Sequence, residues 1–212
     1  MVGIYDYTVI LTYMSVASAI SGIGFAFNDR PFLAILCLML SGLFDMYDGK
    51  VARTKKRDQQ AINFGIQIDS LADILAFGVL PVAIGYSIGM NTWYYLPIGV
   101  IFVLAALIRL AHFNVLEEEI AKTKEGRSTS FIGLPTTSVA LILPVVFAAR
   151  GWCGIYFPAI YAASLLVIAV LFVLKLRFVN KPDTKRMIMM IFLGLLEIIM
   201  IMVLFKLWKA TR

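Results

Sequence analysis

Long apolar stretches alternate with short polar segments along the whole chain. A stretch of roughly 20 apolar residues is long enough to cross a bilayer core as an α-helix, so the pattern predicts seven transmembrane helices. These predicted helices cover residues 8–27, 32–52, 64–88, 93–113, 134–149, 155–174 and 187–208. The expected fold class is an all-α integral membrane protein, a polytopic bundle of about seven helices in which residues 1–212 form a single membrane domain.

The amino-terminal segment has no basic region followed by a small-residue cleavage site. We therefore expect the first apolar stretch to be a retained anchor rather than a removed signal. The polar segments are short, so we expect no extramembrane domain.

The composition agrees with a membrane protein. Hydrophobic residues make up 61% of the 212 residues, which is too many for a soluble domain of this size. The formal net charge of +6 is then mainly a topology signal, with some attraction to anionic lipid headgroups, and it does not favour nucleic acid as a partner. Two cysteines, Cys37 and Cys153, provide neither a disulfide framework nor metal-ligand spacing.

The positive charges predict an orientation, because Lys and Arg are retained on the cytoplasmic side. Three loops, 50–57, 114–132 and 175–186, carry most of them and fall on one face of the predicted bundle. We expect a multi-pass protein of the plasma membrane whose active site faces the cytoplasm. An odd number of helices creates one conflict, because it places Lys206, Lys209 and Arg212 on the opposite side.

Residues 44–73 gather unusual polarity between two apolar stretches, including two pairs of aspartates. Asp45 and Asp48 are three residues apart and Asp69 and Asp73 are four apart, so each pair lies on one helical face. A charged carboxylate within the hydrocarbon costs roughly 2.5 to 3.5 kcal/mol, and clustered carboxylates also repel one another. A divalent cation, Mg²⁺ or Mn²⁺, offsets this charge and accepts substrate phosphates as further ligands.

Small residues lie on the same helical faces. Gly49 and Ala52 lie four and seven residues after Asp45, and Gly65 lies four residues before Asp69. They leave backbone bare where a bulky phosphorylated ligand can approach.

Two other interpretations of the aspartates remain. One is a solvated cluster paired with neighbouring Lys and Arg residues. We accept it for Asp58 and not for the other four aspartates, because a solvated face requires neither the placement of glycines nor a repeat on two helices. The other is the proton relay of a small cation-coupled transporter. Such relays seldom need four carboxylates at one depth, and neither internal repeats nor broken apolar helices are evident.

The stretch resembles the signature of the CDP-alcohol phosphotransferases. All eight signature residue types are present, as Asp45-x₂-Asp48-Gly49-x₂-Ala52-Arg53 followed by Gly65-x₃-Asp69-x₃-Asp73. One departure is the basic loop between the two halves, which holds eleven residues where the family pattern has eight.

The resemblance implies transfer of a phosphatidyl or phosphoalcohol group from a CDP-linked donor to an alcohol, with CMP leaving. It implies that Asp45, Asp48 and Asp69 chiefly bind divalent metal, and that Asp73 completes the metal set and acts as the base toward the acceptor hydroxyl. The residues that it implies for the nucleotide and its diphosphate are Asp48, Gly49, Ala52, Arg53, Gly65, Thr8 and Thr12. Members are commonly homodimers, and we expect the same here.

Two further segments resemble the phosphatidylserine synthase branch of that family. They are "LIRLAHFNV", residues 107–115, and "FIGLPTTSVA", residues 131–140, with His112 where the branch has a second arginine. The implied substrates are CDP-diacylglycerol, taken from the membrane lipids, and L-serine. Glycerol 3-phosphate or an inositol phosphate is the alternative acceptor.

Several polar side chains have both a binding and a structural interpretation. We expect Arg109 to hold the serine carboxylate or a donor phosphate, and a snorkelling arginine is the alternative. Asn114 and Arg127 are weaker candidates for the same acceptor or phosphate site. Thr8 and Thr12 recur at helical spacing, which is also typical of packing and interhelical hydrogen bonds.

Overall fold

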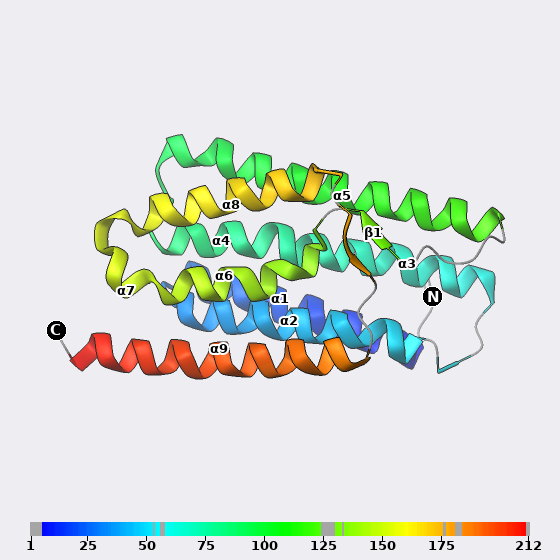
Figure 1. Ribbon diagram of the computed structural model, residues 1–212, viewed down its shortest axis with the longest axis horizontal. Helices are drawn as coiled ribbons and strands as arrows, with labels where there is room; N and C mark the ends of the chain where they lie inside the picture. Colours follow the sequence, from blue (N-terminus) through cyan, green and yellow to red (C-terminus); the bar gives the residue numbers. More distant parts are fainter. Residues whose placement is uncertain are drawn as a thin grey trace.

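Helices run side by side along the long axis of the molecule and build an elongated bundle (Figure 1). The computed structural model describes residues 6–52, 54–55, 58–123, 130–132, 134–175, 177–180 and 184–210. Five helical segments are long and apolar enough to cross a membrane, and two shorter apolar helices, Thr136–Ala148 and Met189–Leu204, lie beside them. The predicted all-α fold is confirmed, and its apolar helices indicate a multi-pass membrane protein.

The α-helices are α1 Ile10–Phe27, α2 Pro31–Ala52, α3 Gln59–Asp73, α4 Leu80–Ser87, α5 Leu96–Thr123, α6 Val139–Ala148, α7 Arg150–Cys153, α8 Phe157–Val173 and α9 Thr184–Ala210. Short 3₁₀ segments at Tyr7–Val9, Trp93–Tyr95, Thr136–Ser138 and Gly154–Tyr156 lead into α1, α5, α6 and α8.

Helices α1 and α2 form a tight hairpin held by small and hydroxyl residues. The Ser41 hydroxyl donates to the carbonyl of Ser15 at 3.1 Å, and the Ser15 hydroxyl donates back to the carbonyl of Ser41 at 3.4 Å. A Cβ added at Gly22 would lie 2.9 Å from the Cβ of Cys37, so only glycine permits this approach. Small residues and interhelical hydrogen bonds are the usual means of packing helices in a membrane.

Helix α3 begins five residues before the predicted boundary at residue 64. The cause is Asp58, whose Oδ1 accepts a hydrogen bond of 2.8 Å from the backbone N–H of Ala61 and caps the helix. The added turn is polar, and hydropathy marks only the apolar part of a helix. For the same reason α5 continues to Thr123, ten residues past the predicted end at residue 113.

A π-helical segment, Ile74–Val79, joins α3 to α4 within one continuous rod. The N–H of Leu80 bonds to the carbonyl of Leu75, five residues back. Pro81 explains this irregularity, because it has no N–H and its ring excludes a close carbonyl one turn earlier. Because of this segment, the side chains of α4 point in a different direction relative to the aspartates of α3 than they would in an uninterrupted α-helix of the same residues.

The apolar core fills the middle of the bundle. Its largest fully buried side chains include Leu38, Phe77, Phe102, Phe157 and Tyr161. The Tyr161 hydroxyl donates to the carbonyl of Pro81 at 3.0 Å, so the one polar atom of this ring is satisfied. Helix α8 is thereby fixed against the start of α4, directly after the π-helical segment.

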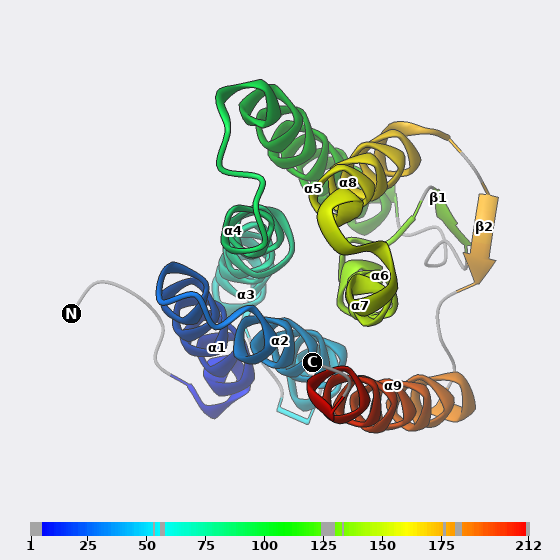
Figure 2. The same cartoon turned by 90° about the vertical axis from the view of Figure 1, so that its left-hand side faces the viewer.

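A short β-ribbon was not predicted. Strand β1, Ser130–Ile132, pairs antiparallel with β2, Arg177–Asn180, with a bulge between Phe131 and Ile132. Both strands lie in segments that hydropathy predicts as loops. Their aromatic and β-branched residues favour extended backbone, and the pairing links the chain after α5 to the chain after α8 (Figure 2).

Helix α9 packs beside α2 and α6 and ends at the far end of the bundle from β1 and β2 (Figures 1 and 2). The end of α9, with Lys206, therefore lies at the opposite end of the bundle from the end of α2. The helix also contains a carboxyl that was not predicted as a notable residue. Glu197 is 5% exposed, and its Oε2 has no hydrogen-bond partner in the part of the chain that the structure describes.

Candidate active site

A polar cavity of about 390 Å³ opens at the end of the bundle that carries the β-ribbon. It lies between the start of α1, the end of α2, helix α3, the later part of α5 and the segment that enters α6. Every predicted site residue that the structure describes lines it: Thr8, Thr12, Asp45, Asp48, Gly49, Ala52, Gly65, Asp69, Asp73, Arg109 and Asn114. Arg53 and Arg127 lie outside the described residues.

The carboxylates of Asp45, Asp48 and Asp69 converge in this cavity. One oxygen from each lies within 4.8 Å of the other two. Helix α2 provides the first two residues from its last turns and α3 provides the third, so helical spacing and the packing of two helices together create the group. Asp48 and Asp73 are the acidic neighbours of Asp45, so carboxyl groups from α2 and α3 are concentrated in this corner of the cavity.

This group of three carboxylates suits a hard divalent cation. Oxygen ligands are those preferred by Mg²⁺ and Mn²⁺, and Mg²⁺ in particular keeps coordination positions for water or substrate phosphate. Three carboxylates from two helices fit such a site, and the mutual repulsion of their charges gives the cation a stabilising role. The metal set predicted from the sequence also included Asp73, which stands beside the group of three rather than within it.

Asp73 is 8% exposed and occupies the inner wall of the cavity. Its Oδ2 accepts a hydrogen bond of 3.4 Å from the hydroxyl of Thr136, which opens the 3₁₀ turn before α6. This contact joins two segments that are 63 residues apart. Asp73 is also the last residue of α3, immediately before the π-helical segment.

Thr12 makes an interhelical hydrogen bond, which was the structural alternative to nucleotide binding for this residue. Its hydroxyl donates to Oδ2 of Asp48 at 3.3 Å, across the α1–α2 hairpin. Thr12 and Thr8 are both buried and both line the cavity. Thr12 therefore fixes the orientation of a carboxylate as well as forming part of the wall.

Gly49 exposes its backbone to open space in the cavity wall. A Cβ built at this position would meet no atom of the described chain within 4 Å. Protein packing alone therefore does not require glycine here. The absence of a side chain leaves room beside the carboxylates for a ligand.

Arg109 is anchored at the cavity wall by backbone. Its Nε donates to the carbonyl of Leu134 at 2.8 Å, and its guanidinium lies 5.6 Å from the centre of the Phe113 ring. The residue is 7% exposed, which does not fit a snorkelling side chain whose charged head reaches water. His112, on the same helix, is exposed and does not line the cavity.

Three hydroxyl residues of the cavity were not predicted from the sequence. Ser70 donates to Oδ1 of Asn114 at 2.9 Å and so connects α3 to α5. Thr136 and Thr137 come directly after Pro135 and face the aspartates from the opposite wall. The available signal was a pair of hydroxyl residues directly after a helix-initiating proline, but spacing alone does not show which distant helix they meet.

An ion pair ties the loop after α2 to the start of the chain. The Nζ of Lys55 lies 2.7 Å from Oδ2 of Asp6, and the Tyr7 hydroxyl lies 3.0 Å from the hydroxyl of Thr54. The hydrogen bond from Lys55 lowers the pKa of Asp6, and the same contact raises the pKa of Lys55. The basic loop thus has contacts of its own beside the cavity.

Comparison with known proteins finds a family and several relatives whose descriptions agree with one another. A sequence model of the family described as CDP-alcohol phosphatidyltransferase matches residues 7–174. The chain is 36% identical over 151 residues to a CDP-diacylglycerol--serine O-phosphatidyltransferase of Saccharomyces cerevisiae, covering 68% of this chain and 54% of the relative. A Mycobacterium leprae protein of the same name is 30% identical over 184 residues, with 81% and 59% covered.

An archaetidylserine synthase of Methanothermobacter thermautotrophicus is 28% identical over 170 residues, which cover 80% of this chain and 67% of the relative. The matched region spans 54% and 59% of the yeast and mycobacterial relatives, little more than half of their length. The family match contains all four aspartates and the cavity that they line. This chain belongs to the CDP-alcohol phosphatidyltransferase family.

Proposed function

We propose that the chain is a phosphatidylserine synthase, an enzyme that transfers the phosphatidyl group of CDP-diacylglycerol to L-serine and releases CMP. The observation that carries this proposal is the meeting of Asp45, Asp48 and Asp69 in one cavity beside the buried Asp73. The names of the yeast and mycobacterial relatives support the donor and the acceptor.

Asp45, Asp48 and Asp69 would hold one or two divalent cations, Mg²⁺ or Mn²⁺. Such a cation, when bound, neutralises charge on the diphosphate of the donor. Thr12 holds the Asp48 carboxylate by its hydrogen bond, so this ligand is oriented before any cation binds. The open space beside Gly49 accommodates the diphosphate, while Thr8, Ala52 and Gly65 line the path for the nucleotide, with Arg53 as a further cation.

Asp73 would act as the base. It accepts the proton of the serine hydroxyl, and the serine oxygen attacks the phosphorus that bears diacylglycerol. The bond from that phosphorus to the oxygen of CMP then breaks, and CMP leaves with the electron pair. Thr136 donates to Oδ2 of Asp73 and helps to fix the carboxylate at the cavity wall, which supports a role as a positioned general base.

Arg109 would bind the carboxylate of serine or a phosphate of the donor. Its fixed position against Leu134 suits a planar anionic partner. Asn114, held by Ser70, adds an amide to the same wall, and Arg127 remains a weaker candidate. Arg109 is the one Lys or Arg residue among the described residues that line the cavity, which favours serine over a phosphorylated acceptor.

The lipid donor would enter sideways from the membrane. Apolar residues of α3 and α5, namely Ile62, Ile66, Leu110 and Phe113, form the part of the cavity wall that suits acyl chains. The cavity shares its end of the bundle with the end of α2 and with β2, which belong to the basic segments 50–57 and 175–186, so we place it at the cytoplasmic face of the plasma membrane. A homodimer is the expected assembly by resemblance to the family.

One reaction tests the proposal. Purified protein is incubated with CDP-diacylglycerol, Mg²⁺ or Mn²⁺, and either L-serine, glycerol 3-phosphate or an inositol phosphate, and the lipid product is identified by mass spectrometry. We expect phosphatidylserine and an equal amount of CMP with serine only. A lipid product with glycerol 3-phosphate or the inositol phosphate, and none with serine, would assign a different acceptor.

A further inference from the structure

A second cavity lies at the end of the bundle opposite the aspartates. Its volume is about 750 Å³, larger than the aspartate cavity and within the usual range of ligand pockets. It is bounded by the α1–α2 turn, the end of α4, the α6–α7 corner and the last part of α9. Phosphatidyl transfer at the aspartates makes no use of it.

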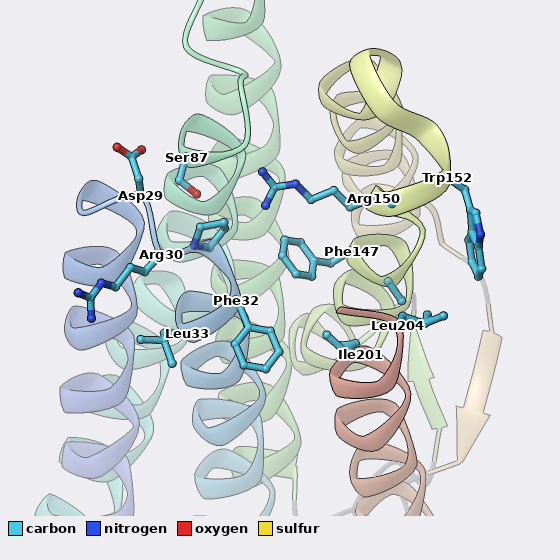
Figure 3. A pocket seen from close by; sticks show the side chains of 13 residues that line it. Asp29, Arg30, Phe32, Leu33, Ser87, Phe147, Arg150, Trp152, Ile201 and Leu204 are labelled. Atoms are coloured by element: carbon cyan, nitrogen blue, oxygen red, sulfur yellow. The ribbon is translucent and has the colours of Figure 1, made fainter. Parts of the chain in front are cut away.

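The walls of this cavity are apolar and its rim is charged. Phe32 of α2, Phe147 of α6 and Leu204 of α9 face one another across it (Figure 3). At the rim the Arg150 side chain extends across the opening toward Ser87, with its guanidinium 5.8 Å from the centre of the Phe147 ring. A cation beside an apolar wall suits an amphiphilic anion, because the charge can meet the anionic group and the wall can meet its apolar part.

The described residues of the rim carry a net positive charge. They include two arginines, Arg30 and Arg150, and one aspartate, Asp29. In Figure 3 the Arg30 side chain points away from the opening, and Arg150 is the cation that reaches across it.

Aromatic residues mark the membrane surface at the same end. Trp93, at the start of the 3₁₀ turn before α5, is 83% exposed, and Trp152 in α7 is 77% exposed. Tyr156 lies on the next turn and is also exposed. Exposed Trp and Tyr gather where lipid headgroups meet the hydrocarbon, so the rim stands at headgroup level and the apolar walls lie deeper.

We propose that this cavity binds an anionic phospholipid of the leaflet opposite the aspartate cavity. Arg150 contacts the headgroup phosphate, and an acyl chain lies against Phe32, Phe147 and Leu204. A soluble anion would use only the rim and leave the apolar walls uncovered. A zwitterionic lipid would bring a positive group to a rim that is already positive.

Native mass spectrometry of the full chain, released from detergent, tests this site. The protein is titrated with phosphatidylglycerol or with phosphatidylcholine of identical acyl chains, and the retained lipid is measured for each variant. Arg150→Gln removes the headgroup contact, and Leu204→Trp fills the cavity while leaving both arginines in place. Lys206→Gln is the matched control, because it removes a positive charge from an exposed position near the same end of α9.

We expect phosphatidylglycerol to bind more tightly than phosphatidylcholine. Arg150→Gln should weaken phosphatidylglycerol binding by about tenfold, as loss of one hydrogen bond to a charged group predicts, and Leu204→Trp should weaken it as well. Lys206→Gln should leave it unchanged. Equal losses for Arg150→Gln and Lys206→Gln, full binding to Leu204→Trp, or equal binding of both lipids would each overturn the proposal.

A second measurement needs no substitution. Phosphatidylglycerol with a photoreactive group on its acyl chain is reconstituted with the unchanged protein and crosslinked. Labelled peptides from the α6–α7 corner and from the end of α9 are expected. Labelling that avoids both segments would refute the site, even if a variant above failed to fold.

Discussion

The hydroxyl of Thr136 donates a hydrogen bond to Oδ2 of Asp73 at 3.4 Å, across the cavity and across 63 residues of sequence. This contact fixes the Asp73 carboxylate against the segment that enters α6.

Thr136→Val keeps the shape of the side chain and removes the donor. The rate constant for phosphatidyl transfer should fall by about tenfold, because a hydrogen bond to a charged group contributes about 1.5 kcal/mol or more. Thr136→Ser, which retains a hydroxyl, should restore most of the rate. Steady-state measurement of CMP release checks both variants, and an equal loss in Thr136→Ser would point to packing rather than hydrogen bonding.

Asp73→Asn should nearly abolish CMP release. A positioned general base contributes about 10² to 10⁴ in rate, and an amide cannot accept the proton. Binding of CDP-diacylglycerol should persist, since the group of Asp45, Asp48 and Asp69 is intact. Near-normal turnover by this variant would rule out Asp73 as the base.

Removal of one metal-site carboxylate should remove metal binding together with activity. For Asp45→Ala or Asp69→Ala, electron paramagnetic resonance of added Mn²⁺ should show loss of the protein-bound fraction even without substrates. Asp58→Ala is the matched control: it removes a carboxylate that caps α3 outside the cavity. It should cost about 0.5–2 kcal/mol in stability and leave Mn²⁺ bound. Retained Mg²⁺-dependent catalysis in either cavity variant would contradict the assignment.

Gly49→Ala should separate folding from ligand binding. The added methyl meets no atom of the described chain within 4 Å, and alanine favours helix, so the melting temperature should stay level or rise. KM for CDP-diacylglycerol should increase, because the methyl occupies the space beside the carboxylates. Gly42→Ala is the contrast: its Cβ would lie 2.6 Å from the Cβ of Ala140, so it should lower the melting temperature. An unchanged KM in Gly49→Ala would mean that the donor does not approach this backbone.

Glu197→Leu should stabilise the protein. The Oε2 atom of Glu197 is buried without a hydrogen-bond partner among the described residues, and an unsatisfied buried group costs about 1–3 kcal/mol. Leucine removes that penalty at similar volume. Thermal unfolding in detergent measures the change, and a lower melting temperature would show that the carboxyl has a stabilising partner in the membrane.

Much of the site could be predicted because its main residues obey helical spacing. Asp45 and Asp48, like Asp69 and Asp73, share a helix face at separations visible in the sequence, and hydropathy placed the helices that carry them. Thr136 could not be predicted in this way, since its contact depends on how two distant helices pack. The β-ribbon and the polar ends of α3 and α5 were missed because hydropathy responds to the membrane and not to the backbone beyond it.

The π-helical segment Ile74–Val79 has a consequence for chain length. A π-helical turn winds less per residue than an α-helix and so takes up one extra residue. Without this winding, that residue would turn α3 by about 100° relative to α4, the rotation of one residue in an α-helix. Either the carboxylates would then leave the cavity or the apolar side chains would leave the interior. A further insertion directly behind Asp73 should therefore not be tolerated, because the segment has already absorbed one residue.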